Sequence, residues 1–130
     1  MYQLMVRSHF DAAHFLRGYQ GKCSKCHGHR FHYSVGISGE TLNDLGILID
    51  FKDVKSILKD EIEEVLDHCL LNEDVPPFDR INPTAENIAK LIYDIVNQTT
   101  ASYFSELLLD LDWVEVYESE NCGIRYWEDR

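Results

Sequence analysis

The chain has 130 residues, of which 45% are hydrophobic and 27% are charged, as in ordinary globular proteins. This length predicts one domain spanning residues 1–130, and the net charge of −11 argues against broad binding of nucleic acid or anionic membranes. No apolar run reaches the length of a membrane span and no signal peptide is recognisable, so we expect a cytoplasmic protein. In that compartment the four cysteines would stay reduced and would serve a metal or catalysis before disulfides.

Two segments of alternating hydrophobicity begin the chain, at residues 2–14 and 27–38. A period of two predicts strands with one buried face. Three imidazoles have the same parity as the apolar side chains, those of His14, His27 and His29. If the two strands pair, these rings meet at one end of one face, whereas His9 and His32 have the opposite parity and are expected on the surface.

Residues 23–29 read CSKCHGH and allow three interpretations. The C-x-x-C-H pattern of covalent haem is disfavoured because that group is attached outside the cytoplasm. A zinc knuckle of two thiols and two imidazoles would leave His14 unexplained and would need the adjacent Cys26 and His27 to bind one ion. One histidine alone would most simply be a hydrogen-bonded core residue. Three converging histidines favour a zinc site with an open coordination position, and a cysteine kept out of the metal shell then becomes a candidate base or nucleophile.

Two helices and two further strands follow. Asp50 can cap a helix with an apolar stripe from residue 51 to 66, and a second helix begins at Thr84, or at Asn82 with Pro83 in its first turn. Residues 113–119 and 123–127 are predicted strands around a turn. The order β-β-α-α-β-β predicts an α+β fold, in which an antiparallel four-stranded sheet carries two helices on one face.

Three further polar features stand out, and each has two interpretations. Asp67 can orient His68, although a helix-terminal histidine favoured by the helix dipole is the alternative. Glu118 continues an apolar row and would need a partner such as two N–H donors of a heterocycle, or it lies in solvent just past the core. Residues 12–39 contain no acidic residue, which indicates either an anionic ligand or chance clustering of Arg17, Lys22, Lys25 and Arg30.

With these residues in place, the chain resembles the 6-pyruvoyl-tetrahydropterin synthase / 6-carboxytetrahydropterin synthase family over nearly its whole length. The resemblance rests on six motifs in the same order and with similar spacing, namely FDAAHFL, CSKCHGH, GILIDF, LDHCLLN, NPTAEN and VYES. The three residues between Cys23 and His27 resemble the carboxy branch, since the pyruvoyl branch tends to have a longer gap. Cys26, directly before His27, departs from the usual pattern, and we expect it to be an incidental buried thiol.

The resemblance implies the tunnelling fold, assembled as a homohexamer of two trimers with active sites at subunit interfaces. It implies Zn²⁺ on the three histidines, Cys23 as the catalytic thiol, Asp67 and His68 as its acid–base partners, and Glu118 as the anchor of a pterin ring close to Thr84 and Ala85. The implied reaction converts 7,8-dihydroneopterin triphosphate to 6-carboxy-5,6,7,8-tetrahydropterin with loss of triphosphate and acetaldehyde, for queuosine and related deazapurines.

Three alternatives remain open from the sequence. The same substrate could yield 6-pyruvoyl-tetrahydropterin, on the route to tetrahydrobiopterin. A related lyase on this scaffold could cleave dihydroneopterin side chains by a retro-aldol route. From a different class, a non-enzymatic zinc-binding module could use CSKCHGH to fold and then dock a partner.

Overall fold

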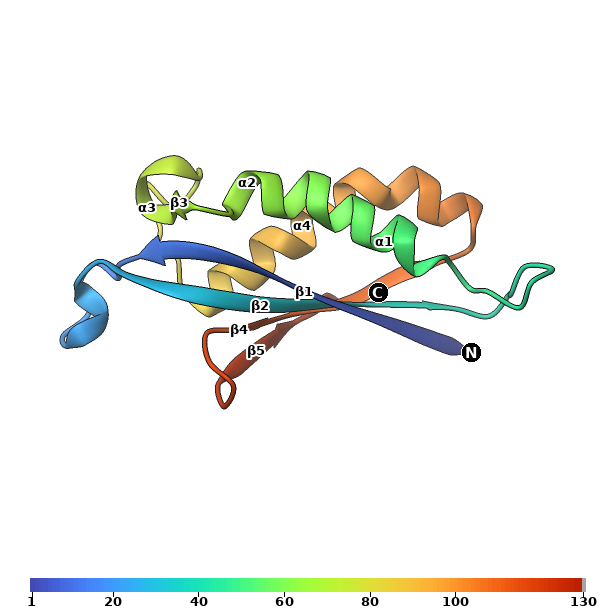
Figure 1. Ribbon diagram of the computed structural model, residues 1–130, viewed down its shortest axis with the longest axis horizontal. Coiled ribbons are helices and arrows are strands. Elements are labelled where there is room, and N and C mark those ends of the chain that lie inside the picture. The colour runs from blue at the N-terminus through green and yellow to red at the C-terminus, as the bar shows by residue number, and fades with distance from the viewer. Residues whose placement is uncertain (130) are drawn as a thin grey trace.

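The computed structural model describes residues 1–129 and shows one sheet with its helices on one face (Figure 1). The strand order is β3-β1-β2-β4-β5. The strands are β1 (Tyr2–His14), β2 (His27–Gly39), β3 (Cys69–Leu70), β4 (Asp110–Tyr117) and β5 (Gly123–Tyr126). The long strands β1 and β2 are antiparallel in a register that runs from Tyr2 opposite Gly39 to His14 opposite His27. This register places the last residue of β1 directly beside the first residue of β2.

The helices begin where the sequence predicts. The Asp50 side chain accepts a hydrogen bond from the Lys52 N–H, and the Thr84 side chain accepts one from the Asn87 N–H, so both residues are N-caps. The helical segments are α1 (Phe51–Leu58), the π-helical η2 (Lys59–Glu63), α2 (Glu64–Leu66), the short α3 (Leu71–Asp74) and the long α4 (Ala85–Glu106). A single turn of 3₁₀ helix, η1 (Lys22–Ser24), lies in the connection between β1 and β2.

The prediction of a four-stranded, fully antiparallel sheet is wrong in one respect. The two-residue strand β3 pairs in parallel with Ala12 and Ala13 at the edge of β1 and makes a fifth strand. Two residues are too few to show a period, so no hydrophobic pattern marks this strand. The predicted strand at 113–119 begins earlier and ends earlier than expected, at Asp110 and Tyr117.

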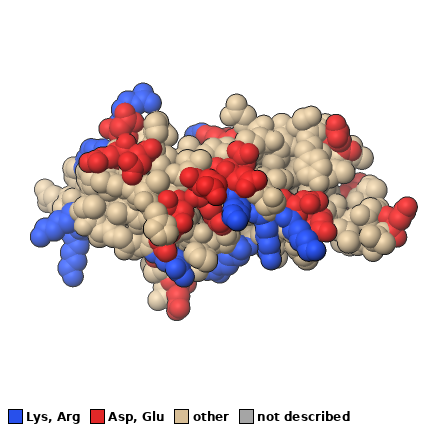
Figure 2. Space-filling model, turned by 45° about the horizontal axis from the view of Figure 1, so that its top comes forward, with Lys and Arg blue, Asp and Glu red and all other residues tan. Residues whose placement is uncertain are grey.

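The core lies between the sheet and the helices. Phe10, Phe31 and Tyr33 are fully buried, and the Phe10 and Phe31 rings stack with their centroids 5.1 Å apart. Ile88, Ile92 and their neighbours on α4 pack against the same face. None of the helices within residues 1–129 is long and apolar enough to cross a membrane. Figure 2 shows abundant acidic side chains on the helical face, while Lys and Arg atoms project at the end where β1 connects to β2.

Candidate active site

Three histidines meet at one end of the β1–β2 ladder. His14 ends β1, His27 begins β2 opposite it, and His29 lies two residues further along the same face. One ring nitrogen from each of the three lies within 4.8 Å of the other two. The ring centroids are 4.7 Å apart for His14 and His27 and 4.7 Å apart for His27 and His29. The convergence predicted from strand parity is therefore present in the fold.

Backbone carbonyls fix the orientation of two of these rings. Nδ1 of His14 donates to the Pro83 carbonyl oxygen at 2.7 Å, and Nδ1 of His27 donates to the Lys25 carbonyl oxygen at 2.6 Å. A carbonyl can only accept, so each Nδ1 carries the hydrogen and each Nε2 keeps its lone pair. Metal-binding histidines are typically oriented in this way by a partner on the second ring nitrogen.

Burial leaves two ring nitrogens without a partner. His14 is 1% exposed, and among the described residues 1–129 the Nε2 atoms of His14 and His29 are buried without a hydrogen bond. Desolvation lowers the pKa of both histidines, and the Pro83 carbonyl and Glu118 only partly oppose this for His14. Neutral imidazoles with unused lone pairs are the form that binds a metal ion. The donor set therefore fits Zn²⁺, and occupancy by that ion stays a prediction.

A pocket of about 410 Å³ brings together four of the other predicted residues. Its lining includes Cys23 from the β1–β2 connection, Thr84 and Ala85 at the start of α4, and Glu118 just after β4. Glu118 lies in a bend just after β4 and its side chain is 35% exposed, so it is neither in the core nor fully in solvent, and its pairing with a heterocycle stays a prediction. Its Oε1 lies 3.9 Å from the His14 Nε2, which places the pocket next to the histidine cluster.

Asp67 and His68 form a pair at the opposite edge of the sheet. Asp67 accepts hydrogen bonds from the Asp11 N–H at 2.8 Å and from His68 Nδ1 at 2.7 Å, and both lower the pKa of its carboxyl group. The His68 N–H donates to the Asp11 carbonyl at 2.6 Å, which holds His68 at a φ of 60°. Such left-handed backbone in a residue other than glycine costs roughly 1–3 kcal/mol and clusters at functional sites. The His68 side chain is 81% exposed.

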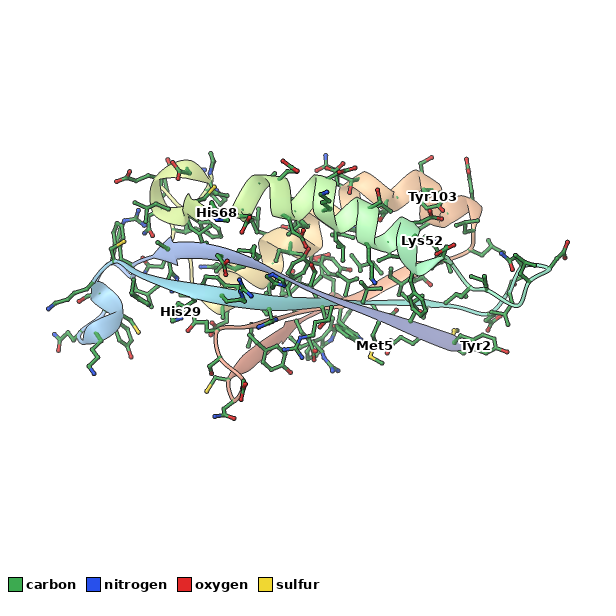
Figure 3. All side chains as sticks on the ribbon, in the orientation of Figure 1. Tyr2, Met5, His29, Lys52, His68 and Tyr103 are labelled. Atoms are coloured by element: carbon green, nitrogen blue, oxygen red, sulfur yellow. The ribbon has the colours of Figure 1, made fainter. Side chains whose placement is uncertain are left out.

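The fold thus separates the predicted site into two parts. Cys23 and Glu118 line one pocket, whereas His68 lines another whose lining includes Asp11, Arg30 and His29. Because Asp67 and His68 are bonded to the outer edge of β1, strands β1 and β2 lie between them and the end of β4. Figure 3 shows His29 and His68 at the same end of the sheet, far from Tyr2.

Three features of the site differ from expectation or were not foreseen. Cys26 is exposed, so the expectation of an incidental buried thiol is wrong, because the chain there has not yet entered the sheet. The contact of His14 with the Pro83 carbonyl was missed, since 69 residues separate the two and a backbone oxygen leaves no mark in a sequence. Tyr19, which lines the Cys23 pocket, was also missed because it belongs to no periodic segment.

Comparisons with known proteins find similar sequences and a similar fold. Residues 3–129 match the family described as 6-pyruvoyl tetrahydropterin synthase. A 6-carboxy-5,6,7,8-tetrahydropterin synthase of Bacillus subtilis (strain 168) is 40% identical over 99 residues, which are 73% of this chain and 65% of that protein. One of the same description from Rickettsia felis (strain ATCC VR-1525 / URRWXCal2) is 32% identical, covering 91% of this chain and 94% of its own. The solved structure of Caenorhabditis elegans 6-pyruvoyl tetrahydropterin synthase shares the fold, with a TM-score of 0.83, 24% identity and coverage of 98% and 96%.

Proposed function

The chain belongs to the 6-pyruvoyl tetrahydropterin synthase family, and we propose that it converts 7,8-dihydroneopterin triphosphate to 6-carboxy-5,6,7,8-tetrahydropterin. Water is consumed, and triphosphate and acetaldehyde leave. The product would feed the synthesis of queuosine and related deazapurines. Several relatives of the carboxy type, including the Bacillus subtilis protein, support this branch.

One observation carries the proposal, namely the single pocket that joins a free thiol and a half-buried carboxylate beside three metal-competent imidazoles. Glu118 would accept two N–H bonds from the pterin ring, a charge-assisted contact that fixes the ring edge. Thr84 and Ala85 would close the pocket at the start of α4. Cys23 would remove and return a proton at side-chain carbon. Zinc held by the three histidines would supply Lewis-acid polarisation of the side-chain oxygens.

The second acid–base group would come from a neighbouring subunit. His68 and Asp67 lie at the β1 edge of the sheet, and the Glu118 pocket lies toward β5, which forms the other edge. Sheets joined edge to edge in a head-to-tail ring would bring the His68 of one subunit to the pocket of the next. We therefore propose a homohexamer built from two trimeric rings, with each site shared between subunits.

Two lysines are the candidates for the triphosphate. Of the four basic residues between positions 12 and 39, Arg17 donates to the Phe78 carbonyl and Arg30 forms a bidentate ion pair with Asp11. Lys22 and Lys25 are exposed on either side of Cys23 and have no ion pair recorded within residues 1–129. Their charges are therefore available to an anion at the pocket mouth.

Product analysis tests the proposal directly. The zinc-loaded protein is incubated with 7,8-dihydroneopterin triphosphate, the pterin product is identified by mass spectrometry, and the small fragment is trapped as a hydrazone. We expect 6-carboxytetrahydropterin, acetaldehyde and triphosphate. A 6-pyruvoyl product would assign the other branch of the family, and a shortened side chain with retained phosphate would indicate retro-aldol cleavage. No turnover together with tight zinc binding would favour the non-enzymatic module.

A further inference from the structure

We propose that the aromatic ring of Tyr19 forms a wall of the pterin pocket and stacks on the face of the bound heterocycle. This inference rests on the proposed function and assigns a substrate-positioning role to a residue outside the motifs that define the site. Tyr19 lines the same pocket as Cys23 and Glu118, yet it comes from the connection between β1 and β2 rather than from a strand or helix.

The connection is a closed loop that holds Tyr19 in place. The Leu16 N–H donates to the Cys23 carbonyl at 2.8 Å and joins the two ends of the loop. Arg17 lies within this loop and anchors it to the rest of the fold, because the Arg17 N–H donates to Oδ1 of Asn82 at 2.8 Å and the Arg17 carbonyl accepts from Nδ2 of Asn82 at 2.9 Å. The residue that bears the candidate thiol and the residue that bears the ring are thus parts of one anchored turn.

Two glycines give this turn its course. Gly18 and Gly21, on either side of Tyr19, have φ values of 76° and 131°, which side-chain-bearing residues rarely adopt. A Cβ atom at Gly21 would lie 3.5 Å from Cε1 of Tyr19, so the ring folds back over the bare backbone of Gly21. The turn therefore sets the position of the ring as well as the path of the chain.

The chemistry of the pocket calls for such a wall. Glu118 can recognise only the polar edge of a flat heterocycle, and the two faces of the ring need apolar or aromatic partners. Leu16 and Ile124 supply aliphatic surface to the lining. Tyr19 is 54% exposed, and within residues 1–129 its ring has no recorded aromatic partner. A ligand that covers this ring removes apolar surface from water, which favours binding.

The test is a titration of the zinc-loaded protein with neopterin, a fluorescent pterin that has no triphosphate. Binding is measured as quenching of the pterin fluorescence. Removal of an aromatic stacking partner from a heterocyclic base weakens binding by roughly tenfold, so we expect Tyr19→Leu to raise the dissociation constant by that factor. Tyr19→Phe keeps the ring and should stay within about twofold. Tyr2→Leu is the matched control, because Tyr2 is 52% exposed and lies at the far end of the sheet (Figure 3).

The outcomes separate this inference from the proposed function. If the wild type binds neopterin and Glu118→Gln weakens binding, but Tyr19→Leu binds as tightly as Tyr19→Phe, the stacking wall is refuted and the proposed function stands. If the wild type neither binds neopterin nor converts the triphosphate substrate, both fail together; if it converts the substrate without binding neopterin, an unchanged KM in Tyr19→Leu refutes the stacking wall alone. Zinc content and circular dichroism of Tyr19→Leu show whether the variant is folded. The second expected result is kinetic: Tyr19→Leu should raise the KM for the triphosphate substrate and leave kcat nearly unchanged.

Discussion

Removal of the zinc ion that we propose for the three histidines should lower the thermal stability of this protein by a large and calculable amount. Within residues 1–129 the Nε2 atoms of His14 and His29 are buried without a hydrogen-bond partner, and each such atom costs about 1–3 kcal/mol. Zinc at a thousand times its dissociation constant stabilises the folded state by about 4 kcal/mol. A chain of 130 residues unfolds with an entropy of roughly 270 cal/mol/K. Dividing the zinc stabilisation of about 4 kcal/mol by this unfolding entropy predicts that zinc raises the melting temperature by about 15 °C.

The assay measures the melting temperature of each variant with zinc and with a chelator and compares the two values. The destabilisation caused by any cavity that a substitution leaves is present in both measurements and cancels in their difference. His14→Ala should lose the zinc-dependent rise because it removes a ligand. Cys23→Ala and Cys26→Ala should keep the rise, since neither thiol belongs to the donor set. His9→Ala is the matched control, because His9 lies on the same strand and is exposed on the other face.

The refuting result is a reversal of this pattern. If Cys23→Ala lost the rise while His14→Ala kept it, the thiols would be the ligands and the three-histidine centre would be wrong. Zinc content by atomic absorption on the same samples separates loss of the ion from loss of the fold.

Three further predictions concern the separation of His68 from the Cys23 pocket and the hydrogen bonds that Asp67 and Asn72 make near the site. The variants Cys23→Ala and His68→Ala, each inactive alone, can be mixed, unfolded and reassembled together. If each site takes Cys23 from one subunit and His68 from another, about one quarter of wild-type activity should return. No recovery would place both residues of a site in one chain. The pKa of Asp67 is held below 3.8 by a backbone N–H and the His68 ring. Its stabilisation is therefore complete above that value and lost as the pH falls through the lower native pKa. The free energy of unfolding of Asp67→Asn in urea should therefore depend less on pH than that of the wild type below about pH 4. Asn72 is buried, and its side chain hydrogen-bonds to both the N–H and the carbonyl of Phe15. Asn72→Ala should therefore lower the free energy of unfolding, measured by denaturant titration, by roughly 2–4 kcal/mol. A loss below about 0.5 kcal/mol would contradict this structural role of Asn72.

Much of the fold follows from local patterns. Strict alternation in residues 2–14 and 27–38 predicts both long strands, because side chains on a strand point to alternate faces. Asp50 and Thr84 mark the first turns of α1 and α4, since their short polar side chains satisfy free N–H groups at a helix start. The two-residue β3 is different, because it forms only where the backbone beyond α2 meets the edge of β1.

For the site, strand parity alone predicts which side chains share a face, and hence that His14, His27 and His29 converge once β1 and β2 pair. Parity along a strand is a local property, so it holds without knowledge of the rest of the fold. Tertiary packing was needed to show that Glu118 approaches His14, that Pro83 orients that ring, and that Asp67 and His68 lie across the sheet from Cys23. These relations join residues far apart in the chain through strand order and loop packing, and neither is encoded in the spacing of residue types.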